Sequence, residues 1–88
     1  MTELLEVATP ALVLDLDRLE RNLRHMQDRA DTLEVGLRPH IKTHKCLEIA
    51  RMQRDLGCAG LTVATLDEAR VFAEHGFRDL TWAFPTRP

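Results

Sequence analysis

The sequence predicts an α/β fold in which strands and helices alternate and the strands pair in parallel. Short apolar runs, typical of buried strands, alternate with segments whose apolar residues recur at spacings of three and four, typical of amphipathic helices. A strand–helix unit that begins with a glycine also repeats along the chain. Repeated units of this kind predict right-handed crossovers and a parallel sheet. The repeated positions are Gly57, Leu61, Thr62 and Ala64, matched by Gly76, Leu80, Thr81 and Ala83.

The first unit is a strand followed by a long helix. Residues 8–16 are apolar and β-prone, and they predict a strand that is buried on both faces. Asp17 and Glu20 have the spacing of a capping box, which predicts a helix start there, and Gly36 ends the helical pattern. The predicted apolar stripe of this helix is Leu16, Leu19, Leu23, Met26, Ala30 and Leu33.

The second unit is predicted to be a short strand followed by a helix. Residues 37–43 predict a short strand, although Pro39 cannot donate a hydrogen bond to a ladder. Thr43 is placed to cap the next helix, and Gly57 has the position of a left-handed residue just past its end. The expected buried face of that helix is Cys46, Ile49, Ala50, Gln53 and Leu56.

The third unit begins with a strand at residues 61–64. Thr65 and Glu68 form a second capping-box pattern, and the helix that they open is expected to end at Gly76. Residues 80–84 predict a further strand, closed by a proline. The residues expected in the core from this unit are Leu66, Ala69, Phe72, Ala73, Trp82 and Phe84.

Composition excludes several classes of protein. With 44% hydrophobic and 30% charged residues in 88 positions, the chain is predicted to be one ordinary globular domain at most, not a disordered protein. A net charge of −2 gives no reason to expect nucleic-acid binding. There is no signal peptide and no membrane-spanning run, and Cys46 and Cys58 have no pairing pattern, so we expect a soluble cytoplasmic protein.

Lys42 is the candidate reactive residue. Parallel strands present their carboxyl ends at one edge, where active sites of such folds lie, and Lys42, Thr65 and Pro85 all fall at strand ends. Burial there, with other cationic groups nearby, would lower the pKa of the lysine, and a neutral amine is what Schiff-base formation with an aldehyde requires. These neighbouring groups are Arg38, His40, His44 and Lys45.

Other interpretations of these residues stay open. Lys42 fits a solvated surface position as well, and Lys45 is an alternative Schiff-base lysine. His40, His44 and Cys46 suggest a zinc site, but a complete site needs three or four ligands and no further residue has a suitable spacing. Three strand–helix units cannot close an eight-stranded barrel, which predicts that the chain is part of a longer protein.

Three segments resemble the D-threonine aldolase and D-serine dehydratase family. They are residues 9–15, the Arg-Pro-His-x-Lys-Thr-His-Lys run within residues 37–45, and residues 61–65 followed by Glu68-Ala69. These enzymes are fold-type III pyridoxal-phosphate (PLP) enzymes, related to the N-terminal domain of alanine racemase. The resemblance implies that the chain holds the first βα units of a PLP-binding (β/α)₈ TIM-type barrel, incomplete here. It also implies that residues 8–16 belong to a C-terminal β domain absent from this chain.

The same resemblance implies a function and a site. It predicts a PLP-dependent lyase acting on a β-hydroxy D-amino acid, in which Lys42 forms the Schiff base. His40, beside Lys42, and Thr65, at the same predicted sheet edge, are further candidates for contact with the cofactor. A divalent metal whose ligands lie outside this chain and a homodimer at full length are further expectations. The alternatives are an amino-acid racemase, which the lack of any tyrosine disfavours, and a non-catalytic PLP-binding or interaction fragment.

Overall fold

The computed structural model describes residues 14–84. Most of the predicted first strand, residues 8–13, lies outside the described residues. The end of that prediction is wrong, because Leu14 and Asp15 have no strand structure and Leu16 is the first residue of a helix. Within residues 14–84 the elements, in chain order, are α1 (Leu16–Thr32), the 3₁₀ turn η2 (Ile41–Thr43), α2 (Leu47–Leu56), β1 (Leu61–Val63), α3 (Leu66–Glu74) and β2 (Leu80–Trp82).

Helix α1 starts and stops slightly earlier than predicted. Its cap is Asp15, whose side chain accepts a hydrogen bond from the backbone N–H of Arg18 at 3.1 Å, so the predicted start at Asp17 is wrong. The helix ends when Glu34 takes a left-handed conformation with φ of 56°, two residues before Gly36. The N–H of Val35 then closes the last turn on the carbonyl of Ala30, at 3.0 Å.

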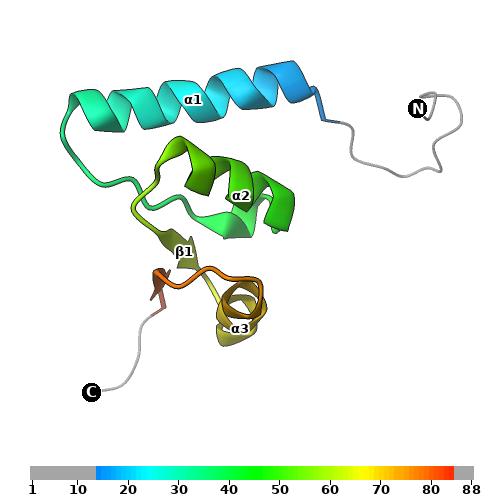
Figure 1. The fold of residues 1–88 in the computed structure, drawn as a ribbon. Helices are drawn as coiled ribbons and strands as arrows, with labels where there is room; N and C mark the ends of the chain where they lie inside the picture. Colours follow the sequence, from blue (N-terminus) through cyan, green and yellow to red (C-terminus); the bar gives the residue numbers. More distant parts are fainter. Residues whose placement is uncertain (1–13, 85–88) are drawn as a thin grey trace, which may run out of the picture.

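The apolar stripe of α1 is only partly covered. This helix packs on α2, on the side away from the sheet, as Figure 1 shows. Because α2 covers one part of the stripe, Ala30 is buried and Leu19 and Leu23 are half-buried. The expectation that the whole stripe is buried is wrong for the remaining members, Leu16, Met26 and Leu33, which are exposed.

The parallel sheet is confirmed. Strands β1 and β2 pair in parallel, with Leu61 opposite Leu80, and α3 forms the crossover between them. Residues 37–40 run along the other side of β1, where the N–H of Thr62 donates to the carbonyl of Pro39 at 2.8 Å and His40 forms a single parallel bridge with Thr62.

The predicted strand at residues 37–43 is therefore wrong: its first half runs beside β1 with only a single bridge at His40, and its second half leaves the ladder. After the bridge at His40 the chain turns into η2, which removes Ile41, Lys42 and Thr43 from the ladder. Thr43 does not cap α2, because its hydroxyl donates to the carbonyl of His40 at 3.3 Å instead. Helix α2 begins at Leu47 without any side-chain cap.

Two of the three predicted glycine stops, Gly57 and Gly76, are confirmed. Gly57 and Gly76 adopt φ of 109° and 93°, which a residue with a side chain rarely tolerates, and each ends the preceding helix. Beyond Gly76 the ring of Phe77 folds back on that of Phe72, with 5.5 Å between ring centroids. This contact between the end of α3 and the following turn fixes the direction in which the chain enters β2.

A small apolar core lies between the sheet and helices α2 and α3. Its largest fully buried side chains are those of Ile41, Leu61 and Val63, and Phe72 of α3 packs in the same cluster. The cluster as a whole is Ile41, Ala50, Leu61, Val63, Phe72 and Phe77. Because Ile41 belongs to η2, the core holds the turn that carries Lys42.

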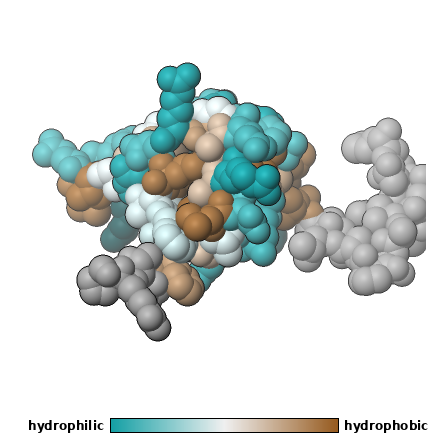
Figure 2. Space-filling model, turned by 90° about the horizontal axis from the view of Figure 1, so that it is seen from below, coloured by the Kyte–Doolittle hydropathy of each residue, from teal (hydrophilic) through white to brown (hydrophobic). Residues whose placement is uncertain are grey.

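Several side chains expected in the core lie at the surface. Leu66 and Ala73 of α3 are exposed, and Phe84 is 61% exposed. Trp82 is 38% exposed and stacks on Phe84, with 5.8 Å between ring centroids. Figure 2, which views the molecule from the α3 side, shows apolar side chains interrupting the polar surface. The exposure of Trp82 follows from its place on β2, an edge strand among the described residues.

Between Leu14 and Phe84 we find no helix with both the length and the apolar character needed to cross a membrane.

Candidate active site

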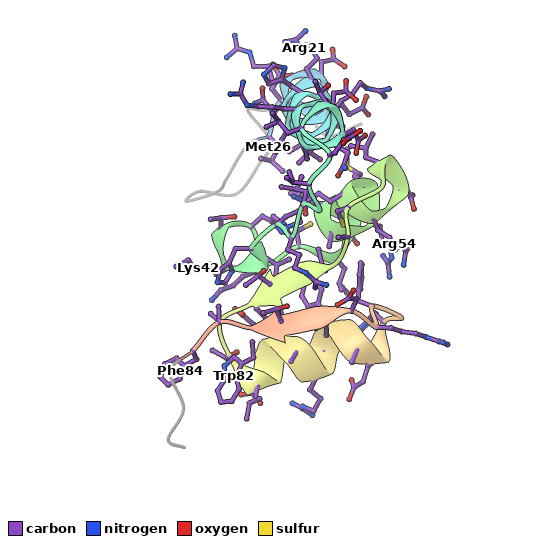
Figure 3. All side chains as sticks on the ribbon, turned by 90° about the vertical axis from the view of Figure 1, so that its left-hand side faces the viewer. Arg21, Met26, Lys42, Arg54, Trp82 and Phe84 are labelled. Carbon is purple, nitrogen blue, oxygen red and sulfur yellow. The ribbon has the colours of Figure 1, made fainter. Side chains whose placement is uncertain are left out.

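Lys42 lies in η2, beside the carboxyl ends of the strands. Figure 3 shows its side chain at the same edge of the sheet as Trp82 and Phe84. The side chain is exposed, and within residues 14–84 it forms no ion pair and no side-chain hydrogen bond. Two expectations thus need correction: the lysine follows a 3₁₀ turn instead of ending a strand, and the described residues do not bury it.

His40 holds the start of this turn. Its Nδ1 accepts a hydrogen bond from the backbone N–H of Lys42 at 3.2 Å, so the imidazole caps η2. A backbone amide can only donate, so Nδ1 is unprotonated and the ring proton of the neutral imidazole is on Nε2. Of the two nitrogens of the His40 ring, only the Nε2–H is left without a partner among the described residues, so this is the group through which His40 would contact the predicted cofactor.

His44 bonds the chain on the far side of the turn. Its Nδ1 accepts from the N–H of Cys46 at 2.9 Å, and its Nε2 lies 3.2 Å from Oε1 of Gln53 on α2. Nε2 carries the proton and donates it to Gln53, because Nδ1 is the acceptor. Burial lowers the pKa of His44, and the hydrogen bond with Gln53 opposes that shift.

The zinc hypothesis for His40, His44 and Cys46 gains no support. Both Nδ1 atoms accept backbone hydrogen bonds, and the thiol of Cys46 donates to Oε2 of Glu48 at 3.2 Å. Hydrogen bonds from the N–H of Glu48 itself and then from that thiol lower the pKa of Glu48. In the part of the chain that the structure describes, no three His, Cys, Asp or Glu side chains gather in a way that could hold a metal ion.

The half-buried ring of His44 predicts a pH-dependent stability. The unfolded chain titrates this ring near 6.5, above its folded pKa, so below that pH the unfolded state binds more protons. The stability contributed by the neutral ring is therefore present above about pH 6.5 and is lost as the pH falls toward the folded pKa. We expect urea denaturation to show a loss of stability from pH 7.5 to 5.5 that is smaller in His44→Gln. His25→Gln, which alters an exposed ring on α1, should keep the wild-type loss, and an equal reduction in both variants would contradict this origin.

Thr65 lies at the carboxyl end of β1 and acts as a helix cap, as predicted. Its hydroxyl accepts from the N–H of Glu68 at 3.0 Å, and Oε1 of Glu68 accepts from the N–H of Ala64 at 2.7 Å. Beside it a cavity of about 310 Å³ opens between β2 and the start of α3. Its lining consists of Ala64, Thr65, Leu66, Asp67, Trp82 and Phe84. Thr65 thus shares the sheet edge with Lys42 but lines a cavity that Lys42 does not.

A second cavity, of about 330 Å³, lies between α1, α2 and the lysine-bearing turn. His40 and Thr43 line it, together with Gln27 of α1. Gln27 is buried, and its Nε2 donates to Asp31 at 2.9 Å, while its Oε1 has no hydrogen-bond partner among residues 14–84. Gln27 was not among the residues predicted for the site, although its spacing of four from Leu23 and three from Ala30 places it on the apolar face of the helix.

Arg38 is not part of the lysine's surroundings. Its guanidinium binds the carboxylate of Asp79 with both nitrogens, at 2.8 and 2.9 Å, and also donates to Thr81 at 3.3 Å. The hydrogen bonds with Asp79 raise the pKa of Arg38 and lower that of Asp79. Asp79 directly precedes β2, so this pair lies at the amino ends of the strands, opposite the lysine. Neither Asp79 nor the glycine beside it, Gly60, carried a recognisable sequence signal.

Lys45, the alternative lysine, sits in a strained position. Its φ is 50°, and its N–H donates to the carbonyl of Ile41 at 2.7 Å. Non-glycine residues adopt this conformation only where the surrounding structure holds them. The chain thus reverses sharply between η2 and α2, directly after Lys42 and His44.

Comparison with known proteins identifies the family. The family model described as "Alanine racemase, N-terminal domain" matches residues 14–86. The chain belongs to this family. The resemblance and the fold class inferred from the sequence are confirmed, and the α/β units described above are part of the barrel of fold-type III PLP enzymes.

Curated relatives of this alanine racemase N-terminal domain chain are lyases by name. D-threo-3-hydroxyaspartate dehydratase of Delftia sp. (strain HT23) is 47% identical over 85 residues, which cover 97% of this chain and 22% of the dehydratase. D-threonine aldolase of Arthrobacter sp. is 49% identical over 77 residues, covering 88% and 20%. D-serine dehydratase of Dictyostelium discoideum is 40% identical over 82 residues, covering 86% and 20%.

The structural comparison agrees. The solved structure of the Delftia dehydratase matches with a TM-score of 0.91 at 46% identity, covering 96% of this chain and 22% of that one. The chain therefore spans about a fifth of the length of the relatives that it matches.

Proposed function

We propose that this chain contributes the lysine-bearing part of a PLP-dependent lyase that acts on a β-hydroxy D-amino acid. The observation that carries the proposal is Lys42, an uncommitted primary amine on a turn that is anchored at the carboxyl edge of a parallel sheet. Relatives named as aldolases and dehydratases of D-amino acids support the reaction class.

The described residues fit the attachment of PLP. The amine of Lys42 has no ion-pair partner within residues 14–84 and lies exposed, so it is free to react with an aldehyde. His40 adjoins it and has a free Nε2–H, and Thr65 lies at the same sheet edge. We propose that Lys42 holds the cofactor covalently and that His40 and Thr65 contact it. When bound, PLP withdraws electrons from the Cα of an amino acid.

The described residues contribute to the proposed reaction by placing and orienting the side chain of Lys42. Ile41 anchors the turn through its side chain, which is buried in the core. The Nδ1 of His40 holds the backbone N–H of Lys42 by a hydrogen bond. Groups held in this way lose little freedom when a reactant binds, which lowers the entropic cost of reaching the reactive geometry. The His40 ring could also hold a proton at Nε2 beside the reacting centre.

Two finer points of the proposal concern other groups. The described residues do not fit a divalent metal, so any metal that holds the substrate hydroxyl would need ligands from elsewhere in a longer protein. We likewise propose that residues 8–13, the part of the predicted segment 8–16 that lies outside the described residues, belong to a separate C-terminal β domain and that the full-length protein is a homodimer. The two free thiols, Cys46 and Cys58, favour a cytoplasmic location.

The alternatives differ in what they need from the chain. A racemase is disfavoured because the relatives named above are lyases. A non-catalytic PLP-binding fragment needs only the attachment at Lys42. Turnover of D-threonine or D-serine therefore separates a lyase from a carrier.

The test is covalent labelling of the 88-residue chain. Lys42 and Lys45 are its two lysines, so PLP trapped by borohydride has three possible sites, counting the N-terminal amine. We expect mass spectrometry to find the pyridoxyl group mainly on Lys42. Lys42→Arg should remove this label, because arginine stays protonated, while the matched control Lys45→Arg should keep it. Labelling that is equal on both lysines, or unchanged in Lys42→Arg, would refute the assignment.

A further inference from the structure

We propose that His44 is a positioning residue for Lys42, whose ring ties the lysine-bearing turn to helix α2 with one hydrogen bond from each nitrogen. This inference rests on the proposed function of Lys42 and adds a residue to it. The side chain of Lys42 forms no hydrogen bond or ion pair with the described residues, so its placement among them depends on the backbone at either side.

The two bonds of the His44 ring add hydrogen bonds to the core packing that already joins η2 and α2. Nδ1 accepts from the N–H of Cys46 at 2.9 Å, just before α2, and Nε2 donates to Oε1 of Gln53 at 3.2 Å, nine residues along the chain. The N–H of His44 also donates to the carbonyl of Ile41 at 3.3 Å. The residue thus contacts η2 through its backbone and α2 through its ring.

The hydrogen bonds around His44 hold the strained backbone of Lys45. Lys45 has a φ of 50° and lies between His44 and Cys46. The bond from Cys46 N–H to the ring of His44 closes a loop around that strained residue, and the bond from Lys45 N–H to Ile41 at 2.7 Å holds it from inside. Without the ring, the chain reversal would relax, because left-handed backbone persists only where its surroundings hold it. Relaxation at Lys45 would displace the turn that carries Lys42.

The occupied nitrogens distinguish His44 from His40. His40 uses one nitrogen to cap η2 and keeps Nε2–H free, whereas both nitrogens of His44 have partners. A ring with no free nitrogen cannot transfer a proton or bind a metal without first breaking a bond. Its role is therefore to act through Lys42.

The test measures where pyridoxal phosphate attaches, using Lys45 as an internal reference. In wild type, His44→Ala and His44→Asn, the borohydride-trapped label is quantified on Lys42 and on Lys45. We expect the ratio of Lys42 to Lys45 labelling to fall about tenfold in His44→Ala, as for the loss of two part-buried hydrogen bonds. His44→Asn, whose Oδ1 can still accept from Cys46, should lose less, and the exposed His25→Ala should leave the ratio unchanged.

Additional readouts separate positioning from simple unfolding. Circular dichroism shows whether each variant is folded. If His44→Ala is unfolded, its labelling ratio is replaced in the comparison by that of Gln53→Leu, which removes only the hydrogen bond between His44 and α2. A ratio that stays at the wild-type value in folded His44→Ala overturns the proposal, and so does an NMR spectrum that places the ring proton on Nδ1.

A failure of the proposed function would look different. If wild type shows no preference for Lys42, the cofactor assignment is wrong, and hydrogen exchange of the Cys46 amide then tests the tie alone. Exchange at least tenfold faster in His44→Ala than in His25→Ala supports the tie. Equal exchange rates in the two variants refute it.

Discussion

Replacing Ile41 with alanine should reduce the free energy of unfolding by about 2–5 kcal/mol, the usual cost of truncating a fully buried isoleucine. Ile41 is 0% exposed and belongs to the central apolar cluster. Its carbonyl also accepts the hydrogen bonds of His44 and Lys45, so a shift of this residue reaches the whole turn. We therefore expect the variant to lose both stability, measured by urea denaturation, and selective labelling of Lys42.

A graded series controls for this effect. Ile41→Val removes one methylene group and should cost about 0.5–1.5 kcal/mol, which remains measurable if the alanine variant does not fold. Leu33→Ala truncates an apolar side chain that is 61% exposed and should change stability by no more than about 0.5 kcal/mol. Equal losses at Ile41 and Leu33 would show that the core does not hold the lysine-bearing turn.

Replacing Gly60 with alanine should be nearly as damaging, at about 1–3 kcal/mol. A Cβ at this position would lie 2.5 Å from Nη1 of Arg38 and 2.7 Å from the carbonyl oxygen of Asp79. The arginine tip can move, but the Asp79 carbonyl accepts the first β1–β2 hydrogen bond, from the N–H of Leu61 at 2.9 Å. Relief of the clash therefore breaks either the Arg38–Asp79 pair or the end of the sheet.

Hydrogen exchange and a second glycine test this explanation. The Leu61 amide should exchange faster in Gly60→Ala, because its acceptor has moved. Gly36→Ala is the matched control, since its new Cβ would meet only Cβ of Ala59, at 3.1 Å, and should cost less. Wild-type stability in Gly60→Ala, with the Leu61 amide still protected, would contradict the predicted clash.

Local sequence predicted those features that depend on bonds between near neighbours. Thr65 caps α3 through an N–H three residues away, and Gly57 and Gly76 end their helices by adopting a left-handed conformation. Both effects act within one helical turn, so they are encoded by spacing alone. The parallel pairing of β1 and β2 followed from the repeated strand–helix unit.

Spacing could not predict the contacts that the assembled sheet creates. Arg38 finds Asp79 forty-one residues away, at the opposite edge from Lys42, although the sequence places Arg38 close to the lysine. The turn η2 replaces a strand after Pro39, and Trp82 remains exposed on an edge strand. Each outcome depends on which strand lies next to which, information that is absent from a window of a few residues.

The candidate site likewise has features that the sequence predicted and features that depend on long-range contacts. The amino-acid sequence alone determined the family, the reactive lysine to propose and the caps that begin and end helix α3, because these depend on residue identity and short-range hydrogen bonds. Only the tertiary structure decided that Lys42 lies on a 3₁₀ turn, anchored by Ile41 and tied to α2 through His44 and Gln53. The physical reason is that burial and long-range hydrogen bonds exist only once distant segments have packed together.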